Sequence, residues 1–530
     1  MPIPEPNTPW LPAPWDFAYK SFAENDAWYT GDTAALAKMY GREGATRSTH
    51  VRHGQQMHGG LVGAASRMFW GRPVPANENR ARLHVPAPAD LAALASNLVF
   101  AEPPEVRLES PGETKLRRDG KAQTRLDLIA NGDEAHATFN QMGELKSALG
   151  AVALVTRWDT EVADHVWLEP SAADVIIPTF RMGRLVECTM WSEYVKGSVY
   201  YRHLEHHVVG AIEHALFAGS ENNLGRRVPL AEIPETETYA ALVDADSRIL
   251  TGIDRLTAVY NKNMPTAAWR KKGVLASTGR SDFAQLHSLF DWLDETFSSW
   301  MRDLRLGAGK ILVPEAALDV GLIGQGASFD SGREVFAGLN MPGKPGEMAF
   351  DKVQFDIRVE EHEKTAFGIY REILRKAGFS QSAWGDYAGE RQQTATEVDA
   401  KDKASERTRD KKILQERVAI SRAASVALEI DGLVFPGKGG GRYDQPSVIF
   451  PDVSQEDPEK LARTLTLLET ASAISLEQKV RRANPDWDDD KIDPEVKAIR
   501  AERGLSPDPA TFDGTDPAAE SGEIELDVSR

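Results

Sequence analysis

The chain has 530 residues, of which 41% are hydrophobic and 27% are charged, as in ordinary soluble folded proteins. This length exceeds one compact core and is enough for about three domain-sized units of roughly 150 residues each. Acidic residues outnumber basic ones by 80 to 62, which gives a net charge of −18. A generic basic nucleic-acid binder is excluded, because phosphate neutralisation needs a Lys/Arg surplus on the contacting face.

The cysteine content and the N-terminal sequence indicate the cellular compartment of the protein. Cys188 is the only cysteine in the sequence, which excludes an intrachain disulfide and a cysteine-rich zinc module. We expect it to be a small buried hydrophobe. The N-terminus is proline-rich and shows no basic segment followed by an apolar one, and no apolar run approaches the ~18 residues of a membrane span. We therefore expect a soluble intracellular protein.

The N-terminal half predicts an α+β domain. Aromatic residues with helix-like spacing crowd the start of the chain, which predicts packing against a domain or a neighbouring subunit. An apolar stripe predicts a helix over 88–100. Further on, strict alternation predicts a strand over 199–207, with turns at Gly210 and Gly225.

Two long amphipathic helices are predicted in the middle of the chain. Ser281 can cap the first, which runs to residue 305 with apolar residues spaced by threes and fours. Its packing face includes Phe283, Leu286, Phe290, Leu293, Phe297 and Trp300. The second helix covers 358–377. Strand and turn signals between them, including 310–314 and 353–359, predict a small β-rich module carried at the far end of a helical hairpin. The apolar stripe is wider than a lone hairpin can hide, so we expect contact with a neighbouring chain.

The C-terminal part predicts further helices and an acidic tail. A long charged helix is predicted over 396–429, followed by a glycine-rich turn and a strand over 446–450. Helices over 458–473 and 476–503 complete the folded part. The last 25 residues hold seven acids and one base and have little to bury, so we expect a solvated tail.

No pattern in the chain predicts catalysis. One group of residues resembles a metal-ligand cluster: His203, His206, His207 and His214 with Glu205 and Glu213. On a strand, His206 points away from its neighbours, and no helical H-E-x-x-H is present, so we expect histidines on a surface hairpin. The run at 437–442 lacks phosphate-loop spacing, and no G-x-S-x-G elbow exists. We expect no enzyme activity, no metal and no cofactor.

Several stretches spread along the chain resemble portal proteins, the head-to-tail connectors of tailed double-stranded DNA phages, most closely those infecting actinobacteria. They are NDAWYTGD, MFWGRP, HVPAPADLAALASNLVFAEPPEV, ENNLGRRVPL, SDFAQLHSLFDWLDETFSSWMRDLRLGAGKILVP and TATEV. None is a catalytic signature, so the resemblance rests on their order and coverage. It implies an α+β portal fold that assembles into a cyclic ring of usually about twelve copies, a homododecamer, with heterologous interfaces.

The resemblance also implies a division of the chain into named parts. These are a wing (1–280 and 395–452), stem helices (281–306 and 358–377), a clip (307–357), a tunnel loop (378–394), a crown (453–505) and an acidic tail (506–530). The tunnel loop would project toward DNA and contains Ser380, Gln381, Ser382, Trp384, Asp386, Tyr387 and Arg391. Trp384 and Tyr387 either face DNA or pack inward. The clip is locally basic, with Lys310, Arg333, Lys344 and Lys352 lining the exit channel, binding a partner or lying on a solvated surface.

The implied function is a channel for viral genome packaging and DNA ejection at one capsid vertex. The implied partners are other copies of the chain, terminase, a head-completion or adaptor protein, the major capsid or scaffold protein, and double-stranded DNA in transit. The implied location is the virion, and the host cytoplasm during assembly. The acid surplus suits a conduit, so we expect weak, salt-insensitive DNA binding. The alternatives are another phage structural protein, such as a head-tail adaptor, and a metal-dependent hydrolase.

Overall fold

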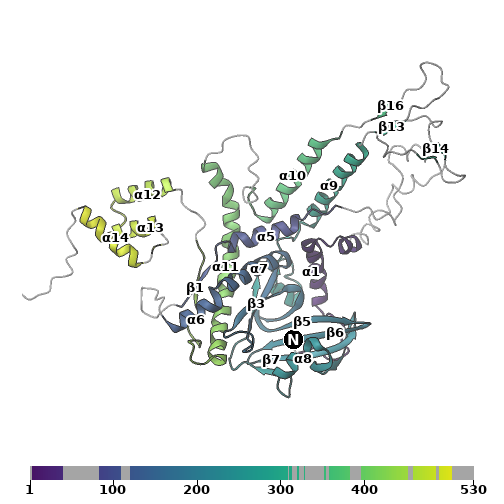
Figure 1. The fold of residues 1–530 in the computed structure, drawn as a ribbon, viewed down its shortest axis with the longest axis horizontal. Helices are drawn as coiled ribbons and strands as arrows, with labels where there is room; N and C mark the ends of the chain where they lie inside the picture. Colours follow the sequence, from purple (N-terminus) through teal and green to yellow (C-terminus); the bar gives the residue numbers. More distant parts are fainter. Residues whose placement is uncertain are drawn as a thin grey trace, which may run out of the picture. The chain divides into compact units, whose positions relative to one another are not determined.

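The computed structural model describes most of the chain and divides it into two compact units, Met1–Pro451 and Asp452–Arg530. The described residues are 3–39, 83–108, 120–307, 310–312, 319–320, 327–328, 351–353, 357–381, 395–451, 458–484, 487 and 489–503. Helices and antiparallel strands are both abundant, which confirms the predicted α+β class (Figure 1). None of the described helices is long and apolar enough to span a membrane.

A six-stranded antiparallel sheet forms the largest β element of the first unit. Its strands are β4 (Ile176–Arg181), β5 (Arg184–Lys196), β6 (Val199–Val208), β7 (Ala211–Ser220) and β8 (Asn223–Val228), with β9 (Arg248–Leu250) paired to β7. The predicted strand over 199–207 is confirmed as β6, and Gly210 lies in the turn that follows it.

Gly225 was predicted to lie in a turn, and that prediction is wrong. It lies inside β8 at a φ of +75°, beside a register shift on β7. A Cβ at this position would lie 2.1 Å from the carbonyl oxygen of Ala218, so only glycine fits this bulged pairing.

A three-stranded sheet lies between two cores. Its order is β10 (Ala258–Lys262), β2 (Ala151–Arg157) and β3 (Trp167–Ala172), all antiparallel. Alternate side chains of β2 enter different cores: Val152 and Leu154 pack with the helices, whereas Ala153 and Val155 pack with Ile176 and other residues of the six-stranded sheet. Because both faces are covered, β2 is apolar without a break until its last two residues.

Helices cover the remaining face of this small sheet. They are α5 (Ala87–Phe100), α6 (Lys121–Ala130), α7 (Asp133–Leu149) and α11 (Ala395–Val434). With 40 residues, α11 spans about 60 Å at 1.5 Å per residue. Its C-terminal half is buried with Ile420 and Leu428 in the core, where β1 (Glu105–Arg107) also pairs with β17 (Ser447–Ile449).

The α9/α10 hairpin consists of α9 (His287–Gly307) and α10 (Val359–Ala377), which run side by side in opposite directions (Figure 1). Beyond their far ends, β13 (Lys310–Leu312) pairs antiparallel with β16 (Asp351–Val353), and β14 (Asp319–Val320) pairs with β15 (Ala327–Ser328). The near end is embedded in a core formed with α5 and α1 (Trp15–Thr30), where the rings of Trp28 and Phe290 lie 5.5 Å apart.

A buried charge network ties this near end to α11. Lys412 of α11 donates to Asp282, just before α9, at 2.6 Å and to Asn263 at 2.5 Å. One turn further along α11, Glu416 is paired with Lys146 of α7. All four charged side chains are at most 7% exposed, so α7, α11 and the base of the hairpin are held by two neutralised pairs.

The structure corrects the start of one predicted helix and the length of one predicted strand. The helix predicted to start at Ser281 starts at His287, because Gln285 takes a φ of +71° and the Ser281 hydroxyl donates to the carbonyl oxygen of Ala148 instead of capping a helix. The strand predicted over 353–359 is also too long, since β16 ends at Val353 and α10 begins at Val359.

The described residues of the second unit form three short helices: α12 (Pro458–Thr470), α13 (Leu476–Ala483) and α14 (Asp489–Glu502). The single helix predicted over 476–503 is therefore two helices. Val480 and Ile492 pack against each other in a small core, and the Ser475 hydroxyl caps α13 by accepting from the amide of Gln478. The predicted acidic tail lies outside the described residues.

Candidate subunit interface on the helical hairpin

The apolar stripe of α9 changes environment along its length. Near the base, Phe283 and Leu286, which lie just before α9, and Phe290 and Leu293 on α9 are at most 2% exposed. They pack against α1 and α5, and the rings of Phe283 and Phe290 meet edge to face at 5.6 Å. These four residues of the predicted packing face therefore belong to the core of the chain itself.

The same stripe continues past the point where the body of the first unit ends. Met301 and Leu304, one and two turns beyond Phe297, are 42% and 39% exposed, and Val359 and Phe367 on α10 are 42% and 49% exposed. An apolar stripe that is buried at the base and bare toward the tip is typical of a surface that a partner covers.

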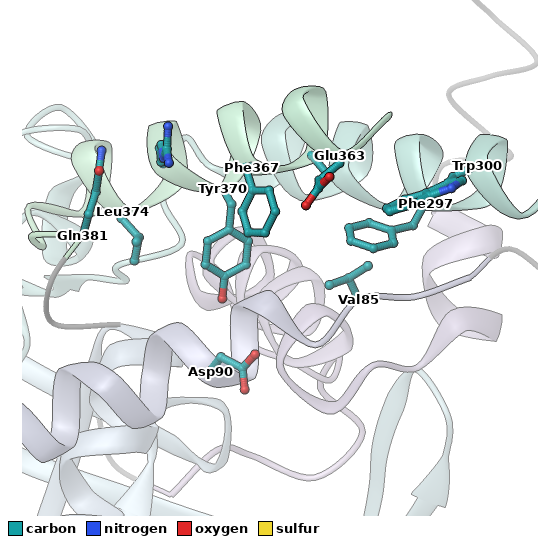
Figure 2. Close-up of a pocket in the computed structure, with 11 residues that line it drawn as sticks. Val85, Asp90, Phe297, Trp300, Glu363, Phe367, Tyr370, Leu374 and Gln381 are labelled. Atoms are coloured by element: carbon teal, nitrogen blue, oxygen red, sulfur yellow. The ribbon is translucent and has the colours of Figure 1, made fainter. Parts of the chain in front are cut away.

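An open groove, here called the hairpin groove, lies where the two helices meet α5 (Figure 2). Its volume is about 390 Å³. Phe297 and Trp300 of α9 form one end, and Phe367, Tyr370 and Leu374 of α10 form the other. The remaining lining residues are Val85, Asp90, Glu363, Ala366, Arg371 and Gln381. An apolar hollow with a few polar groups at its edge suits one aromatic or aliphatic side chain.

Two polar groups of the groove are poorly solvated. Burial raises the pKa of the Asp90 carboxyl above its ordinary value, and burial together with the nearby Asp90 raises the pKa of Tyr370. Figure 2 shows the Tyr370 hydroxyl pointing toward Asp90. The indole N–H of Trp300 has no acceptor among the residues that the structure describes. A partner entering the groove would meet the indole N–H of Trp300 and the carboxyl groups of Asp90 and Glu363.

Polar contacts fix the hairpin at both ends of the groove. Near the base, Asp294 accepts from the amide of Val85 at 2.9 Å and pairs with His84 at 3.0 Å, which holds the start of α5 against α9. Toward the tip, Asp303 binds Arg358 and His362, each at 2.9 Å.

The histidine and arginine contacts of Asp303 lower the pKa of its carboxyl. The His362 ring also stacks on Trp300 with 6.1 Å between centroids. The register of the two helices is therefore set by named side-chain pairs.

The structure describes only some of the residues predicted for the tunnel loop and the clip. Ser380 is buried and shares a hydrogen bond with Ser405 of α11, and Gln381 lines the hairpin groove. Lys310 and Lys352 lie on the paired strands β13 and β16. Outside the described residues lie Ser382, Trp384, Asp386, Tyr387, Arg391, Arg333 and Lys344. The channel and clip roles of all these residues stay predictions.

Sequence reasoning missed Trp292, which lies on the polar side of α9. It sits about 140° around the helix from Phe297 and is 64% exposed, the highest value among the aromatic residues described. The sequence did offer a signal for Trp292. It is an aromatic residue outside the apolar stripe, and packing inside the chain does not explain an aromatic residue at that position. The groove residues Val85 and Asp90 carried no comparable signal, because one precedes α5 and the other lies on it, about 200 residues before α9 in the sequence.

The histidines predicted to lie on a surface hairpin are buried, so that prediction is wrong. His203, His206, His207 and His214 are at most 4% exposed. The rings of His203 and His214 stack on each other, and both contact the ring of Tyr239 on α8 (Pro234–Leu242), which covers this side of the sheet.

A charged pair lies beside the buried histidines. Burial would raise the pKa of Glu205, but Arg157 and His207 more than offset this and hold it well below the ordinary value. No group of three or more candidate ligands that could hold a metal ion exists among the described residues.

No family model matches the chain, and no curated protein matches it. Among solved structures, the chain is similar to one in the neck of an empty gene transfer agent particle computed with C6 symmetry, at 13% identity and a TM-score of 0.37, covering 78% of this chain and 95% of that one. It is also similar to chains in the native particle's virion (14%, TM-score 0.36) and in its neck computed with C12 symmetry (15%, TM-score 0.38), each covering 79% of this chain and 98% of the other.

Proposed function

We propose that this chain is the subunit of a phage portal, a ring at one capsid vertex through which DNA enters during packaging and leaves during ejection. The order and coverage of the stretches that resemble portal proteins support the assignment. The observation that carries it is the α9/α10 hairpin, whose apolar stripe is buried at the base and exposed toward the tip at Met301, Leu304 and Phe367. The paired long helices favour a portal over a head-tail adaptor.

The ring follows from the kind of surface that the hairpin exposes. A cyclic assembly joins one face of each subunit to a different face of the next, so every copy has one surface covered on each side. The bare part of the α9/α10 hairpin supplies such a surface, and the large apolar side chains on it would leave water on assembly. In this proposal about twelve copies close the ring.

The remaining parts are assigned within the same proposal. The segment between α9 and α10 is the clip, which docks terminase and later the head-completion or adaptor protein. The segment between α10 and α11 is the tunnel loop. The second unit contains the crown (453–505), which faces the capsid interior, and the acidic tail (506–530). The protein acts in the virion after assembly in the host cytoplasm, and it binds the passing DNA weakly.

A charge placed on the exposed apolar surface tests the assignment. In Phe367→Asp, the carboxylate lies on a half-exposed site, so the subunit folds but its assembly surface carries an unpaired charge. Leu250→Asp is the matched control, because Leu250 is 73% exposed on β9, away from the hairpin. Sedimentation velocity should show one large species for the natural protein and the control, and mainly monomer for Phe367→Asp at the same concentration.

Two outcomes would overturn this account. A natural protein that stays monomeric at every concentration contradicts the ring. A Phe367→Asp variant that assembles as well as the control shows that the hairpin is not the assembly surface. Far-ultraviolet circular dichroism of each variant verifies that the fold is retained.

A further inference from the structure

Trp292 and the hairpin groove lie on different faces of the same hairpin. Trp292 is 64% exposed on the polar side of α9, whereas the groove opens where α9, α10 and α5 meet. A heterologous interface needs two different surfaces on each copy, one to offer and one to receive. The chain carries a protruding aromatic side chain and an apolar hollow that suit these two roles.

The two features also lie at the same level along the hairpin. The stacked pair of Trp300 and His362 fixes the antiparallel register. Eight residues back along α9 from Trp300 is Trp292, and eight residues forward along α10 from His362 is Tyr370. Both therefore lie about 12 Å below the stacked pair, because each helix advances 1.5 Å per residue. Tyr370 is in the middle of the groove, between Glu363 and Leu374.

Cyclic symmetry requires that two groups in contact across a subunit boundary lie at the same height along the ring axis. A rotation about the ring axis moves every atom around the axis and leaves its height unchanged. Where the hairpin runs along that axis, a side chain of one copy can enter only those sites of the next copy that lie at its own height. The groove meets this condition for Trp292.

Size and polarity agree with the same pairing. The groove volume of about 390 Å³ exceeds the ~150 Å³ that holds a benzene molecule in an engineered apolar cavity, so it can receive an indole ring. An indole carries one N–H donor, and the carboxylates of Asp90 and Glu363 line the groove. An aromatic body with a single donor suits an apolar hollow with acceptors at its edge.

We propose that Trp292 of each subunit inserts into the hairpin groove of the next subunit and is the main anchor of the ring. This inference rests on the portal proposal and names the contact by which its ring closes. Exposed apolar surface on the rest of the stripe then packs around the anchor and excludes water from it.

The first test removes the anchor from the full-length protein. In Trp292→Ala, assembly followed by mass photometry over a dilution series should require at least about tenfold higher concentration, the effect expected of a central tryptophan. Trp292→Phe should recover part of the loss, and Leu250→Ala, an exposed apolar residue elsewhere, should assemble like the natural protein. Since Trp292 is exposed in the single subunit, these variants should keep the natural unfolding midpoint.

The second test identifies the site that receives Trp292. Ser299 lies two turns further along α9, on the same side of the helix as Trp292. Glu363 lies at the same height as Ser299, on α10. With Ser299→Cys and Glu363→Cys in one chain, a short bismaleimide should join each copy to the next and give a ladder on a denaturing gel. The matched control, Ser299→Cys with Lys364→Cys, places the second thiol at nearly the same height but outside the groove, and should give little ladder.

The natural cysteine does not interfere with this experiment. Cys188 is fully buried, and burial raises the pKa of its thiol to about 12, so it stays protonated and out of reach of the reagent. The engineered cysteines are then the reactive thiols of the chain.

The outcomes separate this inference from the proposal beneath it. If the natural protein assembles and Trp292→Ala assembles equally well, or both cysteine pairs react alike, the anchor is overturned while the ring stands. If Phe367→Asp blocks assembly but Trp292→Ala does not, the groove holds a different segment, and the anchor is again overturned. If the natural protein never assembles, both proposals fail.

Discussion

Replacing Lys412 by Met should destabilise the first unit strongly, because it leaves the buried carboxylate of Asp282 without its cation. Lys412 and Asp282 are each at most 7% exposed, and their charged atoms lie 2.6 Å apart. Asp282 keeps two donors, the Ser147 hydroxyl at 2.7 Å and the Asn263 amide at 2.9 Å, but these do not neutralise its charge. Removing one member of a buried ion pair costs about 3–5 kcal/mol.

Hydrogen exchange along α11 measures this loss where it arises. A destabilisation of about 3 kcal/mol speeds exchange of amides that open with the unit roughly 100-fold. Lys411→Met is the matched control, since Lys411 is exposed on the next position and its replacement should change stability by less than about 0.5 kcal/mol.

Adding Asp282→Asn to Lys412→Met should recover much of the loss, because the uncompensated charge is then gone. If Lys412→Met exchanges like Lys411→Met, or if Asp282→Asn brings no recovery, the pair does not hold α11 to the hairpin base in the way described.

Three further outcomes are expected. Phe290→Ala empties a fully buried site between Trp28 and Phe283 and should lower the free energy of unfolding by about 3–5 kcal/mol in a denaturant titration, whereas a change below 1 kcal/mol would contradict the packing. Burial lowers the pKa of His214 to about 4 from 6.5, so on acidification the unfolded chain binds the proton before the folded one does. The free energy of unfolding should therefore fall by up to about 3 kcal/mol from pH 6.5 to 4 and stay constant above pH 6.5. A His214→Gln variant with the same pH slope would refute this. Filter binding to duplex DNA should be weak with a shallow dependence on salt, and tight binding that weakens steeply with salt would contradict the conduit.

Periodicity was enough to predict the helices of the hairpin, because their apolar stripes follow the 3.6-residue repeat that burial on one side imposes. The start of α9 could not be predicted in this way. Ser281 has the side chain of a helix cap, but its hydroxyl bonds Ala148 at the end of α7, a partner 133 residues away. Local sequence propensity cannot predict a tertiary contact of this kind.

The buried histidines illustrate the same limit on the sheet. Alternation correctly placed His203 on the face of β6 that also carries Glu205, yet nothing in that strand reveals that Tyr239 of α8 covers this face. The hairpin groove was out of reach for a similar reason, since its walls come from α5, α9 and α10. Trp292 was within reach, because an aromatic residue on the polar side of an amphipathic helix stands out in the sequence.

The mass and symmetry of the purified natural protein test the central claim most directly. Mass photometry combined with negative-stain electron microscopy should show a closed ring with an open centre and a mass of about 700 kDa, the mass of about twelve chains of 58.3 kDa each. A ring with one more copy would support the same heterologous closure. A protein that remains a 58.3 kDa monomer, or stops at a two-fold symmetric dimer, would contradict it.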